Sequence, residues 1–209
     1  MILSVLDVQR WRNLQPERLQ LHRACNFIFG DNAQGKTNLI EAVYVLCLAK
    51  SFRTREDAEL VPFDAEDFLI DGDFESESGI EHHVGVYYQA AQGKQIKLNG
   101  KRLSQFSALI GKFPIVILSA NDYAITTGPP AERRRFFNVL LAQSSHRYLD
   151  ALKKYEKILK QRNAILSNIA AGQTAAASQL ELWNQQFIET GAEIIRARQT
   201  LVHDLTPIV

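Results

Sequence analysis

Hydrophobic and polar positions in the first fifty residues follow two successive patterns. Short apolar segments separated by polar turns come first, and they predict strands over residues 2–8, 19–21 and 26–29. The last segment ends at Gly30. From Lys36 onward apolar residues recur at helical spacing, namely Leu39, Ile40, Val43, Leu46 and Cys47. A strand, a glycine turn and a helix are therefore predicted in this order.

The middle of the chain again has the short apolar runs that are typical of strands. They cover residues 68–70, 84–88, 96–98 and 115–118, with Gly and Asn between them. Asn99-Gly100 is a hairpin signal because both residue types tolerate positive φ. We therefore predict an antiparallel meander in this section.

Beyond Gly128 the pattern is helical almost to the end of the chain. Pro129 and Pro130 stand where the first turn of a helix accepts proline. Two apolar stripes then predict two long amphipathic helices joined by an Ala- and Gly-rich link at 170–178. The stripes comprise Leu149, Leu152, Tyr155, Leu159 and Leu166, then Leu180, Trp183, Phe187, Gly191, Ile194 and Leu201.

The net charge of +1 conceals a segregated charge pattern. The 209 residues include 24 Lys and Arg and 23 Asp and Glu, and 46% are hydrophobic, which excludes disordered tails and fibrous proteins. Residues 56–81, the acidic block, contain eleven acidic residues and no basic one, whereas residues 131–162 contain nine basic and three acidic residues. Such blocks are candidate interaction surfaces, although a solvated face is the commoner explanation.

Neither a disulfide framework nor a metal cluster is predicted. Cys25 and Cys47 lie in apolar stretches without a second Cys or His at a metal-ligand spacing, so we predict that both are buried. His82 and His83 are neighbours in a predicted strand and point to opposite faces, which disfavours a shared metal. No stretch has the pattern of a secretory leader or of a membrane span. We therefore expect a cytoplasmic protein that does not associate with membranes.

One motif carries chemistry. It is the P-loop pattern of two glycines four residues apart followed by Lys and Thr, in the order Gly30, Asp31, Asn32, Ala33, Gln34, Gly35, Lys36 and Thr37. The glycines let backbone N–H groups and the start of the next helix face phosphates. Lys36 is expected to reach the β- and γ-phosphates, and the Thr37 hydroxyl to help hold Mg²⁺. The alternative, an ordinary glycine-rich turn, is disfavoured by the strand and helix predicted on either side.

The acidic residue that hydrolysis requires at the end of an apolar strand is not evident. Asp71 has the right form, but it lies inside the acidic block and among predicted hairpins. The run at 115–118 ends in Ser119, and Asp122 is too far along the chain. The sequence therefore predicts nucleotide binding more firmly than hydrolysis.

Five blocks in order along the chain resemble the RecF family of bacterial DNA replication and repair proteins. They are Trp11-Arg12-Asn13, residues 30–48, Ser51-Phe52-Arg53-Thr54, Gly128-Pro129 with residues 133–138, and residues 159–164. The resemblance implies an α/β fold with α+β elements: an ABC/SMC-type P-loop ATPase lobe with a mixed sheet at 1–119, and a helical lid domain, a helical hairpin, at 120–209.

The resemblance also implies a mechanism that this chain holds only in part. In that family ATP binds the P-loop face, which pairs with the signature motif of a second copy and closes a homodimer around DNA. The signature motif and the Walker B strand ending in paired acids do not occur before Val209. The chain is therefore expected to be an N-terminal fragment that binds ATP and magnesium without turnover, while the full-length protein is a weak DNA-dependent ATPase.

Further candidate residues follow from the resemblance and from charge. Arg12 matches an arginine that approaches the nucleotide phosphates in related ATPases, with a solvated surface Arg as the alternative. Arg53 is expected to touch phosphate, the lid or DNA. Basic residues of the helical region are candidate DNA or lid contacts, against the alternative of solubilising charges: Arg133, Arg134, Arg135, Lys153, Lys157 and Lys160. The acidic block is a candidate docking site for RecR or RecO, although solvated loops are the commoner explanation.

Three functions compete at this point. The first is an ATP-dependent DNA-binding recombination mediator that acts at double-stranded DNA and single-strand/double-strand junctions in gap repair and SOS induction. The second is a complete small P-loop kinase or GTPase that uses Asp71 for magnesium. The third is a helical scaffold with a vestigial P-loop. The helical pattern at 131–209, with no further catalytic strand, disfavours the second.

Overall fold

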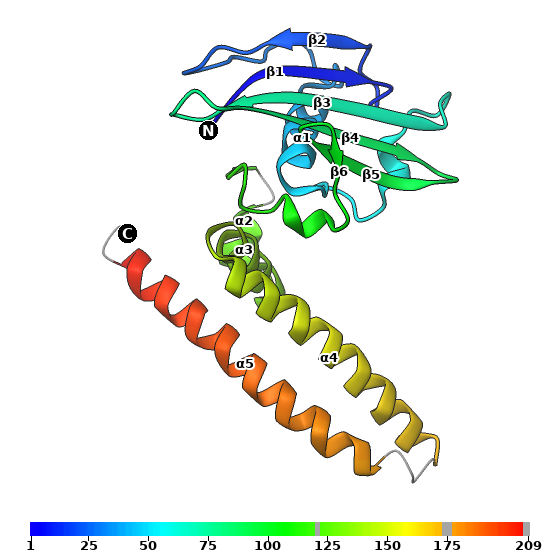
Figure 1. Ribbon diagram of the computed structural model, residues 1–209, viewed down its shortest axis with the longest axis vertical. Coiled ribbons are helices and arrows are strands. Elements are labelled where there is room, and N and C mark those ends of the chain that lie inside the picture. The colour runs from blue at the N-terminus through cyan, green and yellow to red at the C-terminus, as the bar shows by residue number, and fades with distance from the viewer. Residues whose placement is uncertain (120–121, 173–176, 207–209) are drawn as a thin grey trace. The chain divides into compact units, whose positions relative to one another are not determined.

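The chain folds into two compact units. The computed structural model describes residues 1–119, 122–172 and 177–206. The first unit covers Met1–Val116 and the second Ile117–Val209, shown blue to green and green to red in Figure 1.

A six-stranded antiparallel sheet forms the first unit. Its order is β2-β1-β3-β4-β5-β6, and every pairing among the described residues is antiparallel, where a mixed sheet was predicted. The α/β class and the predicted meander from β3 to β5 are confirmed. The strands are β1 Ile2–Gln9, β2 Glu17–Gln20, β3 Asp67–Glu75, β4 Glu81–Gln89, β5 Gly93–Leu98 and β6 Lys101–Arg102.

One face of the sheet forms the core and the other faces solvent. Alternate residues of β3, among them Phe68, Ile70 and Phe74, are buried. Gly72 shares this face, where an added Cβ would lie 2.7 Å from Leu46 of helix α1, Lys36–Leu48. The sheet therefore packs on α1, and the helix starts at Lys36 as predicted. Short 3₁₀ helices η1, Asp57–Leu60, and η2, Phe106–Ala108, complete the unit.

Two predicted strands do not form. Residues 26–29 and 115–118 have no regular secondary structure. Phe27 and Phe29 are 86% and 92% exposed, and Val116 and Leu118 are 81% and 90% exposed. An apolar run becomes a strand only when a neighbouring strand pairs with it, and no described strand does so here. Cys25, predicted to be buried, is exposed in the same region.

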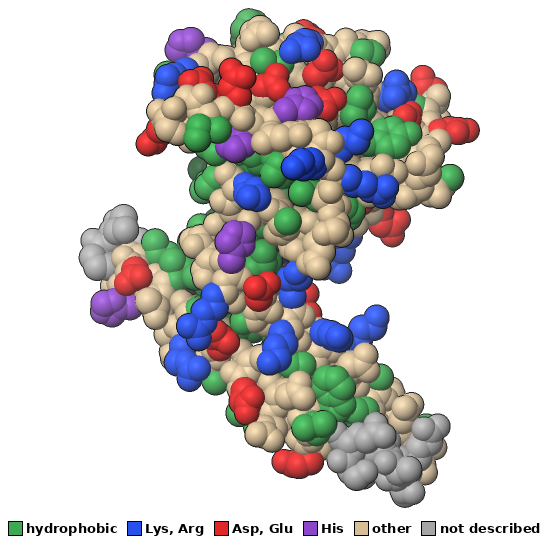
Figure 2. All heavy atoms as spheres, viewed as in Figure 1, with side chains coloured by type: hydrophobic (Ala, Val, Ile, Leu, Met, Phe, Trp, Pro, Cys, Tyr) green, Lys and Arg blue, Asp and Glu red, His purple; other side chains and the backbone are tan. Residues whose placement is uncertain are grey.

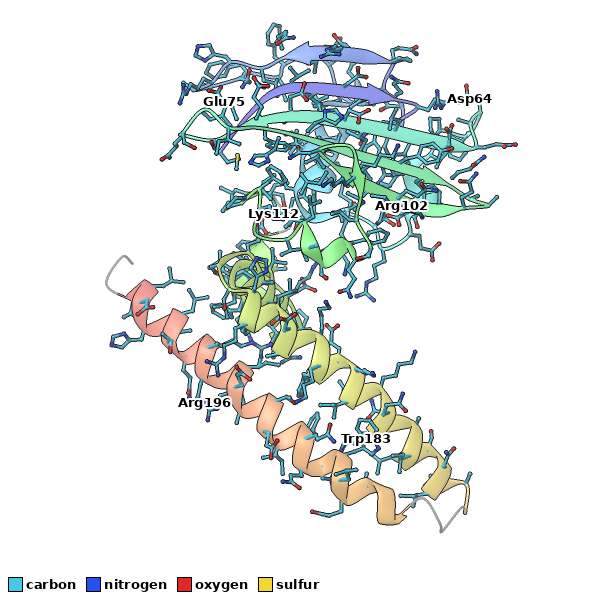
Figure 3. All side chains as sticks on the ribbon, viewed as in Figure 1. Asp64, Glu75, Arg102, Lys112, Trp183 and Arg196 are labelled. Atoms are coloured by element: carbon cyan, nitrogen blue, oxygen red, sulfur yellow. The ribbon has the colours of Figure 1, made fainter. Side chains whose placement is uncertain are left out.

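The acidic block extends along the sheet and is partly neutralised by residues outside it. Glu75 ends β3, and Asp64 lies in the turn just before the opposite end of this strand (Figure 3). Cations from other elements pair with the block: Arg10 with Asp67 at 2.6 Å, Lys94 with Asp57 at 2.6 Å and Arg18 with Asp73 at 3.9 Å. The charge segregation seen along the sequence is therefore weaker in space.

Four helices form the described part of the second unit. They are α2 Tyr123–Thr127, α3 Pro130–Ser144, α4 His146–Ala170 and α5 Ala177–Leu205. Helix α3 begins at Pro130, in agreement with the sequence pattern, and α4 and α5 are the two predicted long helices. Part of the predicted link, residues 173–176, lies outside the described residues. None of the described helices is long and apolar enough to cross a membrane.

Helices α4 and α5 pack through an aromatic pair. The rings of Tyr155 and Phe187 stack with centroids 4.9 Å apart, and an added Cβ at Gly191 would lie 3.4 Å from the Tyr155 ring. Trp183 lies on α5 one turn before Phe187 (Figure 3). Ile158 and Ile165 are buried, whereas Leu166, placed in the predicted stripe, is 37% exposed. Leu149 and Tyr155 of the predicted stripe do face the interior, so the prediction is wrong towards the end of α4, where Ile165 is buried in place of Leu166.

Candidate functional site

The P-loop joins residues 26–29 to α1. Gly30, Ala33 and Gly35 have φ angles of 144°, 65° and 88°. Positive φ at these three positions helps successive backbone N–H groups to line a concavity that favours anions. Backbone conformation and sequence motif therefore point to the same phosphate-binding function.

Gly35 occupies a position that strongly favours glycine. It precedes the first residue of α1 with φ 88°, and an added Cβ would lie 2.3 Å from Leu14 Cδ2. No side chain caps the start of α1. The first N–H groups of the helix are thus left for a ligand, and the helix dipole favours a negative one.

Lys36 is held inside the loop. Its Nζ donates to the carbonyl oxygens of Gly30 and Asp31 at 2.8 and 2.6 Å. Thr37, the predicted magnesium ligand, is exposed in the first turn of α1. The residues present, namely backbone N–H groups, an ammonium group and a hydroxyl, suit a nucleotide phosphate with its cation.

Arg12 is engaged with a buried carboxylate. Its Nε and Nη2 donate to the two carboxylate oxygens of Glu41, both at 2.9 Å, and Nη1 donates to the Glu59 carbonyl at 2.9 Å. Glu41 is fully buried and also accepts from the Ser51 hydroxyl. Glu41 is therefore a salt-bridging residue, and Arg12 links the segment after β1 to α1. The predicted phosphate contact of Arg12 stays a prediction.

Arg53 connects the loop after α1 to the same region. Its Nη1 donates to Asn38 Oδ1 at 2.6 Å and lies 3.5 Å from Glu41 Oε2. The Arg53 side chain is 40% exposed, so part of it remains accessible to a ligand. Arg12, Glu41, Ser51 and Arg53 are called the Glu41 network below.

Two asparagines that sequence reasoning missed complete the surroundings of the P-loop. Asn13 Nδ2 donates to the Ala33 carbonyl at 2.9 Å, and Asn38 Nδ2 donates to Asn13 Oδ1 at 2.6 Å. The buried Trp11 donates from Nε1 to the Asn38 carbonyl at 2.7 Å. Asn13 and Asn38 are 25 residues apart, and only the position of Asn13 beside Arg12 in the Trp-Arg-Asn block could have signalled it.

A cavity of about 860 Å³ lies beside these residues. Arg12, Asn13 and Asn38 form one part of its wall, and Phe63 and Tyr88 bring aromatic surface to it. Phe63 is fully exposed. A cavity of this size next to a phosphate-binding loop can take the nucleoside part of a nucleotide.

Asp71 is not brought to the P-loop. It alternates with Gly72, which faces α1, so Asp71 points to the solvent face of the sheet. There His83 lies between Asp73, at 2.7 Å from Nδ1, and Asp71, at 3.2 Å from Nε2. The hydrogen bond to Asp73 raises the His83 pKa, and partial burial raises the pKa of Asp71. His82 instead contacts Phe113 on the core face. The kinase or GTPase alternative thereby loses its magnesium residue.

The basic candidates of the helical region belong to the second unit, whereas Arg53 belongs to the first. Arg133 Nη1 donates to the carbonyls of Gly128 and Ile125 at 3.1 and 3.4 Å, so it fastens the end of α2. Arg134 and Arg135 are exposed. Lys153, Lys157 and Lys160 are exposed on α4, and Figure 2 shows several Lys and Arg side chains along this helix. No group of three or more His, Cys, Asp or Glu in the described part of the chain could hold a metal ion.

The chain is similar to known proteins over almost its whole length. No protein-family model matches the chain. The DNA replication and repair protein RecF of Prosthecochloris aestuarii is 36% identical over 207 residues, and that of Chloroherpeton thalassium is 37% identical over 204. These alignments cover 99% and 98% of this chain but 56% and 55% of the relatives. The chain thus spans about half the length of the curated relatives that it matches.

A solved structure of RecF also superposes on almost the whole chain. A structure of the recombination mediator protein RecF with ATP, from the RecFOR pathway, superposes with a TM-score of 0.93 at 32% identity, covering 99% of this chain and 55% of that one. An SMC ATPase structure has a TM-score of 0.55 at 16% identity, covers 67% of this chain and 99% of that one, and shows a shared fold. The chain is therefore a RecF homologue that corresponds to the N-terminal part of these DNA replication and repair proteins.

Proposed function

We propose that this chain binds ATP at residues 30–37, as the nucleotide-binding part of a RecF-type recombination mediator in DNA replication and repair. The observation that carries the proposal is the P-loop itself. Three positive-φ residues, an uncapped helix start and Lys36 converge on one concavity. The relatives are named for DNA replication and repair, and one solved relative is described with ATP.

Each residue has a separate part in the proposed site. The backbone N–H groups of the loop and of the start of α1 would hold the phosphates, and Lys36 would exchange its bonds to the Gly30 and Asp31 carbonyls for phosphate oxygens. Thr37 would help hold magnesium, which supplies charge neutralisation between the β- and γ-phosphates. Of the two arginines that contact Glu41, Arg53 is the better placed to reach a ligand, because 40% of its side chain is exposed against 18% for Arg12.

Binding without turnover is proposed for these 209 residues. Hydrolysis needs an acidic residue that helps hold magnesium and a residue that orients the attacking water. Asp71, the candidate acid, points to the other side of the sheet from α1. In the full-length protein we propose a weak, DNA-dependent ATPase that forms an ATP-dependent homodimer, with RecR and RecO as partners. We also propose that it acts in gap repair and SOS induction in the cytoplasm.

DNA binding is proposed for the basic face of the second unit. Lys153, Lys157 and Lys160 are exposed on one side of α4, and lysines at this spacing can neutralise phosphates of a duplex or a single-strand/double-strand junction without reading sequence.

The first unit has exposed apolar residues at Phe27, Phe29 and Val116. We propose that strands from the rest of the full-length protein cover them.

Equilibrium binding of Mg-ATP to the wild-type chain and to Lys36→Ala tests nucleotide binding. Loss of a charge-assisted contact predicts about 10- to 100-fold weaker binding by the variant. Lys50→Ala is a matched control, because Lys50 lies just beyond the other end of α1. Undetectable binding to the wild type would favour the scaffold with a vestigial P-loop.

Charge reversal on α4 tests DNA binding in the full-length protein. Lys153→Glu, Lys157→Glu and Lys160→Glu together should weaken duplex binding and lower the slope of log affinity against log salt by up to about 3. A control with Lys97, Lys101 and Lys112 changed to Glu carries the same charge change in the first unit. An unaltered slope in the α4 variant would count against this assignment.

A further inference from the structure

Asn13 contacts the P-loop backbone at its one non-glycine residue with positive φ. Ala33 has φ 65°, a conformation that a non-glycine residue rarely adopts without support. Asn13 Nδ2 donates to the Ala33 carbonyl at 2.9 Å. Asn13 also packs against Gly35, where an added Cβ would lie 3.0 Å from Asn13 Oδ1. The asparagine therefore lies against one side of the loop.

The orientation of the Asn13 amide is set by its neighbours. Arg53 can only donate, so the Asn38 oxygen that accepts from it, at 2.6 Å, must face Arg53. The Asn38 NH₂ group then faces the Asn13 oxygen at 2.6 Å. This leaves the Asn13 NH₂ group for the Ala33 carbonyl. A single arrangement of both amides satisfies all three hydrogen bonds.

Holding the Ala33 carbonyl also directs the next N–H group. In a planar trans peptide the carbonyl and the following N–H point in opposite directions. The Ala33 carbonyl points to Asn13, so the N–H of Gln34 points away from Asn13. A rotated peptide would turn a carbonyl oxygen toward a bound anion in place of a donor. Asn13 opposes that rotation.

We propose that Asn13 is a positioning residue of the nucleotide site. It holds the Ala33–Gln34 peptide so that the Gln34 N–H remains available to phosphate, and Asn38 with Arg53 fixes the Asn13 amide for this task. The inference rests on the proposed binding of ATP at residues 30–37, which is measured separately in the wild type.

Asn13→Asp is the sharpest variant. It keeps the size of the side chain and the oxygen that accepts from Asn38, but replaces the donor to Ala33 by a carboxylate oxygen. The variant should bind Mg-ATP about tenfold more weakly or worse, while its thermal unfolding midpoint stays close to that of the wild type. Asn99→Asp is the matched control, because its carboxylate can still accept from the His83 N–H, as Asn99 does at 2.8 Å.

Asn38→Asp provides a second variant. It keeps the acceptor for Arg53 but removes the donor to Asn13, so a smaller loss of ATP affinity is expected. The two effects should be non-additive in the double variant, because both act through one hydrogen bond. Wild-type affinity in Asn13→Asp, or equal losses in Asn13→Asp and Asn99→Asp, would overturn the proposal. Absence of ATP binding by the wild type would instead overturn the proposed function.

Discussion

Two groups of side chains place carboxylates beside basic groups: the Glu41 network, and the His83 cluster, which consists of His83, Asp71 and Asp73. The first surrounds a buried carboxylate and the second is exposed to solvent. Glu41 is fully buried, and its main partner Arg12 has 18% of its side chain exposed. His83 and Asp73 expose 49% and 39% of their side chains on the solvent face of the sheet. Water screens the second set and is excluded from the first. The contribution of a carboxylate–cation contact to the free energy of unfolding should therefore be larger where the contact is buried.

The largest expected effect comes from removing the cation of the buried pair. Arg12→Met leaves the Glu41 carboxylate without its bidentate partner, so the free energy of unfolding should fall by about 3 kcal/mol. Denaturant titration measures this loss. Arg10→Met is the matched control: the Arg10–Asp67 ion pair has similar hydrogen bonds, but Arg10 is 45% exposed. The control should lose less than about 1 kcal/mol.

A second substitution sharpens the same test. Adding Glu41→Leu to Arg12→Met removes the buried charge that has lost its bidentate partner and should recover part of the lost stability. Equal losses in Arg12→Met and Arg10→Met, or purely additive losses in the double variant, would show that burial does not separate the two kinds of pair.

The exposed cluster should have a smaller, pH-dependent effect. The folded-state pKa of His83 is raised, first by its hydrogen bond to Asp73, so folding favours the protonated form. This stabilisation is complete below the unfolded pKa of about 6.5 and is lost as the pH rises through the folded pKa. The difference in unfolding free energy between wild type and His83→Gln should thus be below about 1 kcal/mol. It should be larger at pH 6 than at pH 9, and a difference that grows with pH would contradict this assignment.

The smallest effect concerns thiol reactivity as a measure of the burial of α1, the helix that carries Glu41. Burial raises the pKa of the Cys47 thiol to about 12, whereas Cys25 is exposed. A maleimide at neutral pH should therefore modify Cys25 and spare Cys47 in the folded wild type. Arg12→Met should speed the labelling of Cys47, and rapid labelling of both thiols in the wild type would mean that α1 is not packed as described.

The sequence predicted the local parts of the site better than its long-range contacts. Lys36 at the start of α1 and Pro130 at the start of α3 follow from spacing and turn chemistry within a few residues. The Arg12–Glu41 pair joins residues 29 positions apart, and no periodicity encodes such a contact. The runs at 26–29 and 115–118 have strand composition, but pairing depends on a neighbour that composition does not supply.

The burial of Trp11 against Asn38 has an optical consequence. The chain has two tryptophans: Trp11 belongs to the first compact unit and Trp183 to the second. Indole emission shifts to longer wavelength on exposure to water, so each tryptophan can report the unfolding of one unit. With Trp183 replaced by Phe, the remaining fluorescence would come from an indole whose N–H is bonded to the first turn of α1. That single signal would report changes in the packing around the start of α1, next to the P-loop.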